Sequence, residues 1–325
     1  SGLTSIGFGA FANCNFKKLK LPNNVREIGE YAFCQNTDLR SVELPSGLET
    51  VSASMFHGCK RLSSVTLPGS ITTIGNDAFA WCTSLEKIEL PEGLTQIGDS
   101  AFEYAAITDF SIPDGIKSIG KNAFGNTVFT EIVLPDSLNT IGAGAFAENK
   151  HLESIVIPKN ITKLDGTFSS CERLESVTLP AGLVEIKGAF SGCTNLRTIT
   201  LPDSVTTIGD EAFYNSGLRE IELSENLTSI GYNAFAGCYF DNITLPEKLE
   251  DVDTNAFSGG YIYGIYIPGT NVNFETDAIE KNDHLVIIGE AGSTAETYAK
   301  SNDIYFHNIA DTPTHQDATE STCVQ

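Results

Sequence analysis

The chain has 325 residues, of which 41% are hydrophobic, so it can bury a sizeable apolar core. Lys plus Arg number 20 and Asp plus Glu number 42, which gives a formal net charge of −22. Such a negative charge keeps a long molecule in solution and disfavours nucleic acid or an anionic membrane as a partner. No run of residues approaches the ~20 apolar positions that a membrane helix needs, so we expect no membrane span in this segment.

The opening residues already follow a repeat that continues through most of the chain. Residues 1–7 (Ser-Gly-Leu-Thr-Ser-Ile-Gly) align with residues 46–52 (Ser-Gly-Leu-Glu-Thr-Val-Ser), which follow Pro45. We therefore expect the first coil to begin in the middle of a repeat. One full copy runs from Leu67 to Glu89, and Leu90 and Pro91 start the next copy. Self-similarity at such a fixed period predicts a solenoid.

Two residue types mark the repeat in nearly every copy. Eleven of the twelve prolines fall at spacings of 22 or 23 residues, or multiples of them where Ser224 fills one slot. A file of phenylalanines keeps the same period, and Ile279 closes it. The proline column is Pro22, Pro45, Pro68, Pro91, Pro113, Pro135, Pro158, Pro180, Pro202, Pro246 and Pro268. The phenylalanine column is Phe11, Phe33, Phe56, Phe79, Phe102, Phe124, Phe146, Phe168, Phe190, Phe213, Phe235 and Phe257.

Each copy is expected to form one coil with two extended stretches. Before the proline, as in residues 39–44 (Leu-Arg-Ser-Val-Glu-Leu), apolar and polar residues alternate, which is the period of a strand. Proline ends the strand because it has no N–H to donate. A second apolar pair, such as Leu94 and Ile97, lines the next stretch, and the glycine that follows is expected to take a positive φ. The Ala-Phe pair then enters the core on a short helical turn.

These patterns predict a β-rich solenoid over residues 1–288. We expect a right-handed stack of 12–13 coils of 22–23 residues, with a parallel sheet on its concave face and the phenylalanines in single file inside. Two copies are one residue shorter before the phenylalanine, at Gly166 and Gly188, so a tightened corner is expected there.

The repeat fades towards the C-terminus. Residues 289–309 are expected to form a cap, with a short helix that starts at the capping box Ser293-Thr294-Ala295-Glu296 and a final strand near Tyr305. Residues 310–325 are polar and aperiodic, which predicts a disordered tail or a linker.

The repeat resembles the BspA-like class of leucine-rich repeats. The shared pattern is Leu-x-x-Val/Ile-x-Leu-Pro-x-x-Leu-x-x-Ile-Gly-x-x-Ala-Phe-x-x-Cys, and it covers roughly residues 1–288. Residues 292–300 (Gly-Ser-Thr-Ala-Glu-Thr-Tyr-Ala-Lys) resemble the terminal unit of many such bacterial proteins. The resemblance implies a leucine-rich-repeat solenoid that is secreted or carried on the cell surface and acts in adhesion. It implies no catalytic motif.

The eight cysteines do not predict a disulfide framework or a metal site. Six of them occupy one slot, three residues after phenylalanine, which elsewhere holds Asn, Ser, Thr, Ala or Gly. A slot of that kind accepts small residues, and Cys packs there as a compact apolar group. We therefore expect buried free thiols, although bridges between adjacent coils are conceivable. The six are Cys14, Cys59, Cys82, Cys171, Cys193 and Cys238.

No arrangement of residues indicates catalysis, a metal or a cofactor. The five histidines are scattered, and none lies in a nucleophile motif. The sequence has no phosphate-binding loop, no calcium loop and no Cys-x-x-Cys pair. We therefore expect no catalytic residues, no metal ligands and no cofactor.

Two aromatic clusters interrupt the small polar residues of the predicted surface. Tyr263 and Tyr266 fall in the last repeat strand, with Tyr239 and Tyr261 on the adjoining corner and with Asp241 and Glu222 nearby. The second cluster comprises His57, Trp81 and Tyr104, in neighbouring slots of three consecutive coils. Tyrosine and tryptophan are enriched where proteins bind their partners. The alternative is that these rings only cover the end of the core and fill a corner.

The sequence therefore predicts a non-catalytic extracellular protein that binds a protein or glycan partner on host matrix or on a bacterial surface. A monomer is expected. One alternative is a rigid stalk that presents another domain. A second is an enzyme whose site has no recognisable motif.

Overall fold

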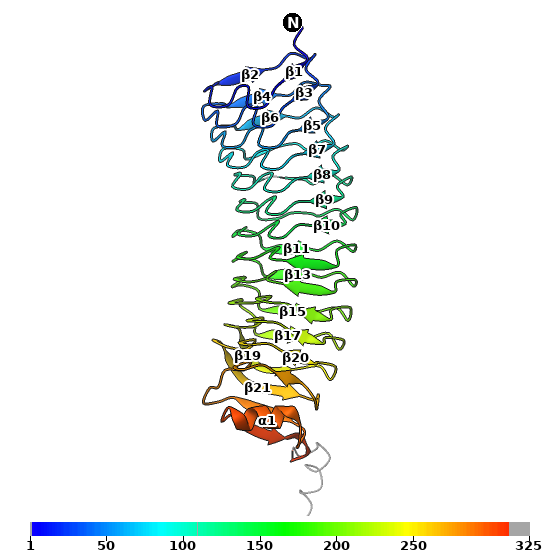
Figure 1. The fold of residues 1–325 in the computed structure, drawn as a ribbon, viewed down its shortest axis with the longest axis vertical. Helices are drawn as coiled ribbons and strands as arrows, with labels where there is room; N and C mark the ends of the chain where they lie inside the picture. Colours follow the sequence, from blue (N-terminus) through cyan, green and yellow to red (C-terminus); the bar gives the residue numbers. More distant parts are fainter. Residues whose placement is uncertain (1, 109, 312–325) are drawn as a thin grey trace, which may run out of the picture.

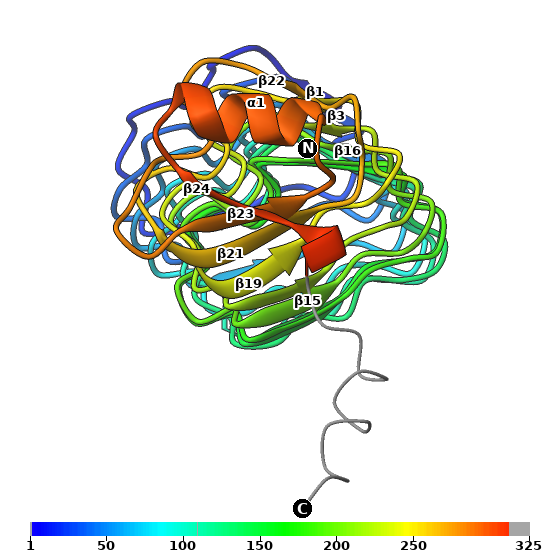
Figure 2. The same cartoon turned by 90° about the horizontal axis from the view of Figure 1, so that it is seen from below.

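A computed structural model describes residues 2–108 and 110–311 of the chain. It is a parallel β-solenoid of many turns with very little helix, as the repeat predicted. Figure 1 shows the coils stacked into one long column, and Figure 2 shows along the column that successive coils lie over one another. Within the repeats, paired strand residues are 22 or 23 positions apart, as in Thr207 with Ser229, so each repeat contributes one layer.

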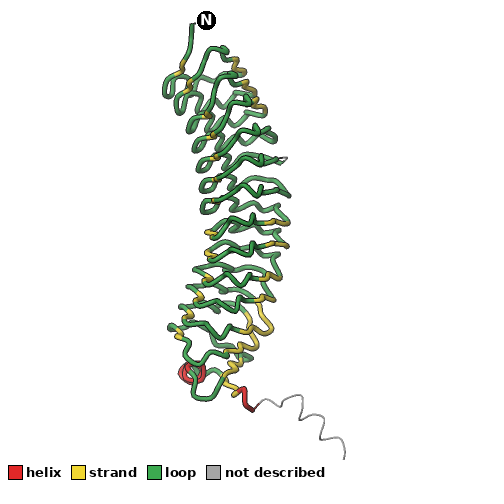
Figure 3. Tube along the Cα trace, turned by 90° about the vertical axis from the view of Figure 1, so that its right-hand side faces the viewer, coloured by secondary structure: helices red, strands yellow, loops and turns green. Residues whose placement is uncertain are grey.

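The predicted single sheet is in fact two columns of short parallel strands, and strand segments appear on both sides of the tube in Figure 3. The column before the prolines contains β2 (Lys18–Lys20), β4 (Ser41–Glu43), β6 (Ser64–Thr66), β11 (Ser154–Val156), β13 (Ser176–Thr178), β15 (Thr198–Thr200), β17 (Glu220–Glu222), β19 (Tyr239–Thr244), β21 (Tyr261–Ile267), β23 (Val286–Gly289) and β24 (Tyr305–Asn308). The column after them contains β1 (Ser5–Ile6), β3 (Glu27–Ile28), β5 (Thr50–Val51), β7 (Thr73–Ile74), β8 (Gln96–Ile97), β9 (Ser118–Ile119), β10 (Thr140–Ile141), β12 (Lys163–Asp165), β14 (Glu185–Lys187), β16 (Thr207–Ile208), β18 (Ser229–Ile230), β20 (Asp251–Val252) and β22 (Asn273–Phe274).

The column after the prolines is the more continuous of the two. Its strands form ladders of two, five and six, whereas the column before the prolines breaks into groups of three, two, two and four. The break between β10 and β12 coincides with the first shortened repeat. There β12 and β14 lengthen to three residues, and Gly166 and Gly188 have φ values of 56° and 55°. The same left-handed φ occurs two residues before the phenylalanine in the regular coils, so the tightened corner predicted from the sequence stays a prediction.

The phenylalanines form the predicted single file through the core. Neighbouring rings from Phe11 to Phe257 stack with centroids 5.3–6.0 Å apart and planes within 16° of parallel. Those from Phe33 to Phe235 are at most 1% exposed. Each ring therefore packs against its equivalents in the coils on either side.

The phenylalanine corners are not the helical turns that the sequence predicted. At each corner alternate N–H groups close local turns, while those between them donate to the next coil. The residues two before and two after the phenylalanine take a left-handed conformation, which an α-helix would not contain. In one coil Asp77, Phe79 and Trp81 donate to the carbonyls of Asp99, Ala101 and Glu103, each at 2.8 Å.

The repeat glycine serves a different purpose from the one predicted. In the regular coils it is absent from the residues with positive φ, so it does not supply a left-handed corner. A Cβ added at Gly120 would lie 2.4 Å from the backbone nitrogen of Asp99, and one at Gly142 would lie 2.4 Å from that of Lys121. These contacts are too short for any side chain, so glycine here permits the close approach of consecutive coils.

In several coils the side chain three residues after phenylalanine donates a hydrogen bond. The sequence predicted only that this slot packs small residues. The Cys82 thiol donates to the Phe56 carbonyl at 3.3 Å. The Asn149 amide donates to the carbonyls of Phe124 and Phe146, each at 2.8 Å. Cys59, Cys171, Cys193 and Cys238 bond the phenylalanine carbonyl of the preceding coil in the same way. In several coils the same carbonyl also accepts a backbone N–H, as Phe56 does from Cys59 at 3.1 Å, so the slot side chain adds a second hydrogen bond that joins consecutive coils.

The seven cysteines among the described residues are free thiols, as expected, and Cys323 lies outside that part of the chain. Burial raises the pKa of Cys59, Cys171 and Cys238 to about 12. Burial also raises the pKa of Cys82 and Cys193 well above the ordinary value. The thiolate is the reactive form, so these slot cysteines should be inert in the folded protein.

The helix and final strand lie where the sequence placed them. Helix α1 (Thr294–Ser301) begins after Ser293, whose hydroxyl accepts the Glu296 N–H at 3.3 Å. Strand β24 pairs in parallel with β23. Of the predicted disordered tail, residues 310 and 311 instead belong to a 3-10 turn (Ile309–Asp311), and residues 312–325 lie outside the described range.

Phe124→Ala removes one ring from the middle of the file. We expect it to lower the free energy of unfolding by ~3–5 kcal/mol through the cavity it leaves, measured by denaturant unfolding. Val133→Ala is the matched control, because Val133 is 82% exposed and its truncation should cost under ~0.5 kcal/mol. Similar losses for the two variants would contradict a core built on the phenylalanine file.

Thiol titration tests the cysteine slot. The unfolded, unreduced protein should show most of its eight cysteines free, and the folded protein should protect the five buried slot thiols from alkylation at pH 8. Two or more disulfides would overturn this account and would favour an oxidising compartment.

Candidate functional site

The tyrosines predicted near the C-terminal end meet on strands β19 and β21. These strands pair in parallel, so that Tyr239 lies opposite Tyr261 and Thr244 lies opposite Tyr266. Beside the first pair is an open groove of about 490 Å³, which we call the tyrosine groove. Its lining residues are Arg219, Tyr239, Phe240, Asp241, Tyr261, Tyr263 and His284.

The aromatic rings of the tyrosine groove lie one beside the next. The Tyr239 and Tyr261 rings are 6.5 Å apart and within 10° of parallel, because they occupy equivalent positions of consecutive coils. Tyr263 lies 6.5 Å from Tyr261 and 6.0 Å from the His284 ring. The three tyrosines are 48–53% exposed. The groove therefore presents a run of accessible ring surface along the column.

Two charged side chains of opposite sign also line the groove. Arg219 and Asp241 are exposed, and neither takes part in a side-chain hydrogen bond or ion pair with any residue that the structure describes. Arg219 lies one coil before Asp241, on the same row of the surface as Tyr263. Sequence reasoning did not single out Arg219 or His284, although the 22-residue period that aligns Arg219 with Asp241 could have done so.

Tyr266 does not line the tyrosine groove. The alternation of strand β21 slips at residues 264 and 265, where Gly264 and Ile265 are both buried in succession. Tyr266 therefore faces outward beyond the slip, between Thr244 and Ile288 of the neighbouring strands. Glu222, which the sequence placed beside the tyrosines, lines a separate groove of about 860 Å³ with Thr244.

The second predicted cluster is brought together in part. The Trp81 and Tyr104 rings stack with centroids 4.0 Å apart and planes 18° from parallel. His57 occupies the slot one residue earlier in its coil, and no ring contact joins it to either aromatic. Trp81 and Tyr104 have φ values of 60° and 59°, in a slot that is left-handed after every phenylalanine of the core file and elsewhere holds residues such as Gln35, Gly58 and Glu148. A bulky residue with this conformation is strained by about 1 kcal/mol or more.

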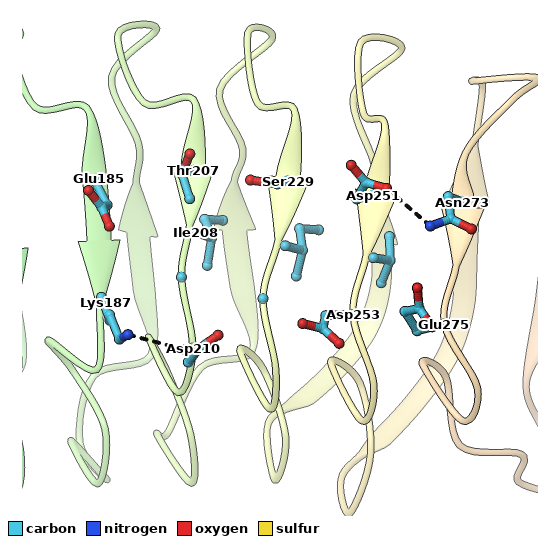
Figure 4. Close-up of a pocket in the computed structure, with 14 residues that line it drawn as sticks. Glu185, Lys187, Thr207, Ile208, Asp210, Ser229, Asp251, Asp253, Asn273 and Glu275 are labelled. Carbon is cyan, nitrogen blue, oxygen red and sulfur yellow. Dashed lines mark hydrogen bonds and ion pairs between the residues drawn. The ribbon is translucent and has the colours of Figure 1, made fainter.

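A third groove, of about 450 Å³, lies on the column of strands after the prolines (Figure 4). Its outward side chains include Asp251, Asp253 and Glu275, and its one lysine pairs with Asp210 at 3.2 Å. The amide of Asn273 donates to Asp251 at 3.1 Å. These residues are exposed and line an open face, so they form part of the solvated acidic exterior expected from the net charge.

The described residues contain no group of three or more His, Cys, Asp or Glu side chains placed to hold a metal ion. Within the same residues, no helix has the length and apolar character needed to cross a membrane.

Comparison with solved structures finds proteins of the same kind. A leucine-rich repeat protein from Bacteroides ovatus is 25% identical, with a TM-score of 0.75 over 94% of this chain and 88% of that one. A leucine rich cell surface protein from Faecalibacterium prausnitzii is also 25% identical, with a TM-score of 0.58 over 91% and 85%. A leucine-rich repeat protein from Eubacterium ventriosum shares the fold at 22% identity, with a TM-score of 0.51 over 75% and 82%.

No curated protein matches the chain. The family model described as the BspA type leucine rich repeat region matches residues 4–127, 95–206 and 165–286. These overlapping matches span almost all of the repeats, including every phenylalanine of the core file. The chain therefore belongs to the BspA-type leucine-rich repeat family.

Proposed function

We propose that the chain is a non-catalytic extracellular binding protein that acts in adhesion and holds a protein or glycan partner at the tyrosine groove. The observation that carries the proposal is the groove itself, where three exposed tyrosines and the unpaired Arg219 and Asp241 adjoin. Elsewhere the outward strand positions hold mostly small polar residues, which offer a partner little contact energy. Partners on host matrix or on another bacterial surface suit this role.

Location outside the cell is part of the same proposal. A solved relative that covers most of this chain is described as a cell surface protein. The acidic, elongated shape suits a surface-exposed molecule, because its net charge of −22 opposes self-association and favours a monomer.

Trp81, Tyr104 and the nearby His57 are proposed as a second, weaker contact. Glycine or asparagine would occupy the slot of the two aromatics without strain, as Gly58 and Asn126 do. Trp81 and Tyr104 instead place two stacked aromatic rings on the surface, and Trp81 is 42% exposed, so a partner can contact them. Tyr266 is the remaining proposed contact, on the sheet face beyond the groove.

A rigid stalk is the alternative function. The unbroken file of stacked phenylalanines would make such a spacer stiff along its length. A stalk needs no exposed aromatic groove, so the experiments below separate the two functions.

Replacing Tyr261 and Tyr263 together with alanine tests the groove. Because exposed aromatic anchors carry much of the energy of an interface, the affinity for partners captured from host matrix or bacterial surface extracts should fall by ~1–3 kcal/mol. Tyr266→Ala, outside the groove, should cost less. Both variants should keep the parent's thermal unfolding midpoint within a few degrees. Unchanged capture by the folded double variant would contradict the site, and no capture by the parent would favour the stalk.

Trp81→Gly tests the second contact. The free energy of unfolding should change by no more than about 1 kcal/mol, because relief of the left-handed strain offsets the lost stack with Tyr104. Partner binding should weaken. A loss of stability near the ~3–5 kcal/mol of a buried aromatic would show that Trp81 only fills the corner. Unchanged binding would remove this contact from the proposal.

A further inference from the structure

We infer that the ligand of the tyrosine groove is a neutral glycan rather than a peptide. This inference rests on the proposed function, since it names the chemical class of the partner at the same site. The sequence alone left both classes open, and the contacts inside the groove discriminate between them.

The rings supply flat apolar platforms of the kind that a sugar ring covers. The planes of Tyr239 and Tyr261 are within 10° of parallel and their rings are one coil apart, and each residue is 53% exposed, so both rings offer surface to a ligand. Tyr263 is inclined by 50° to Tyr261 and closes one side of the groove. The groove volume of about 490 Å³ falls within the roughly 300–1,000 Å³ of small-ligand sites. A pyranose has apolar C–H groups on its ring faces, which pack against such surfaces.

The polar groups of the groove match hydroxyls. Asp241 can only accept hydrogen bonds, and Arg219 can only donate them. Each sugar hydroxyl does both, so one glycan satisfies the two side chains together. The charges of Arg219 and Asp241 balance each other within the groove. A neutral ligand is therefore repelled by neither side chain, whereas Asp241 would repel an acidic ligand and Arg219 a basic one.

The usual ways of holding a peptide are not offered here. Strand β21 pairs with β19 on one edge and with β23 on the other. The other edge of β19 faces the preceding coil, where the Tyr239 N–H donates to the Leu218 carbonyl at 3.0 Å, so that edge is not open to an extended peptide as an added strand. A proline-rich peptide could lie on the tyrosines. However, proline has no N–H to donate, so such a peptide offers the Asp241 carboxylate fewer hydrogen-bond donors than a sugar does.

The test measures direct binding of the 325-residue chain to immobilised neutral oligosaccharides built from glucose, galactose, mannose and N-acetylhexosamines. A proline-rich peptide serves as the competing probe. We expect at least one glycan to bind, with affinity about tenfold lower for each of Tyr263→Ala, Asp241→Ala and Arg219→Ala. Tyr232→Ala is the matched control, because Tyr232 is 43% exposed against 48% for Tyr263 and lies outside the groove. It should bind like the parent.

Three results would overturn the inference. They are binding of the peptide but of no glycan, glycan binding that Asp241→Ala and Arg219→Ala leave intact, and partner capture that survives mild periodate oxidation of the partner's sugars. In the third case groove-dependent capture would still support the proposed function, so the two proposals fail separately. Circular dichroism of each variant confirms that the fold persists.

Discussion

The structure depends on one constraint, which is that every coil must lie directly over its neighbour. Backbone hydrogen bonds set the spacing between coils, and the phenylalanine file fills the interior at the same spacing. A position that is repeated every 22 or 23 residues therefore meets its own copies along the column. This explains why glycine is needed at Gly120, where the preceding coil's backbone would lie within 2.4 Å of a Cβ. It also explains why the thiol of Cys82, in the cysteine slot, reaches the phenylalanine carbonyl of the preceding coil.

The same constraint determines where function can arise. Interior positions are fixed by stacking, and corners are fixed by the alternating hydrogen bonds, so only outward side chains are free to vary. A substitution that appears in two consecutive coils creates an adjacent pair of identical groups, as with Tyr239 and Tyr261. Trp81 and Tyr104 likewise adjoin in consecutive coils, at a slot where the backbone is left-handed. A binding surface on such a scaffold therefore forms where the outward side chains of consecutive coils depart from the repeat.

The sequence predicted the coil count, the phenylalanine file and the C-terminal helix, because each follows from a periodic pattern or a local capping signal. It did not predict the corner conformation. Positive φ values fall on Asp77 and Trp81 rather than on the repeat glycine, and only the contact between coils shows that glycine is required there for space. Likewise, regular strand alternation would place Tyr263 and Tyr266, three residues apart, on opposite faces, and only the slip at Gly264 and Ile265 turns both outward. Arg219 was not singled out from the sequence, and its place in the groove follows from the stacking of its coil on that of Asp241.

The most direct test of the account is a hydrogen-exchange map of the chain with and without a bound partner. The account predicts that protection is added on strands β19 and β21 and around His284, with a smaller change near Trp81, while the acidic groove at Asp253 exchanges as before. Protection spread evenly along the column, or confined to the acidic face, would contradict the claim that aromatic departures from the repeat are the binding surface.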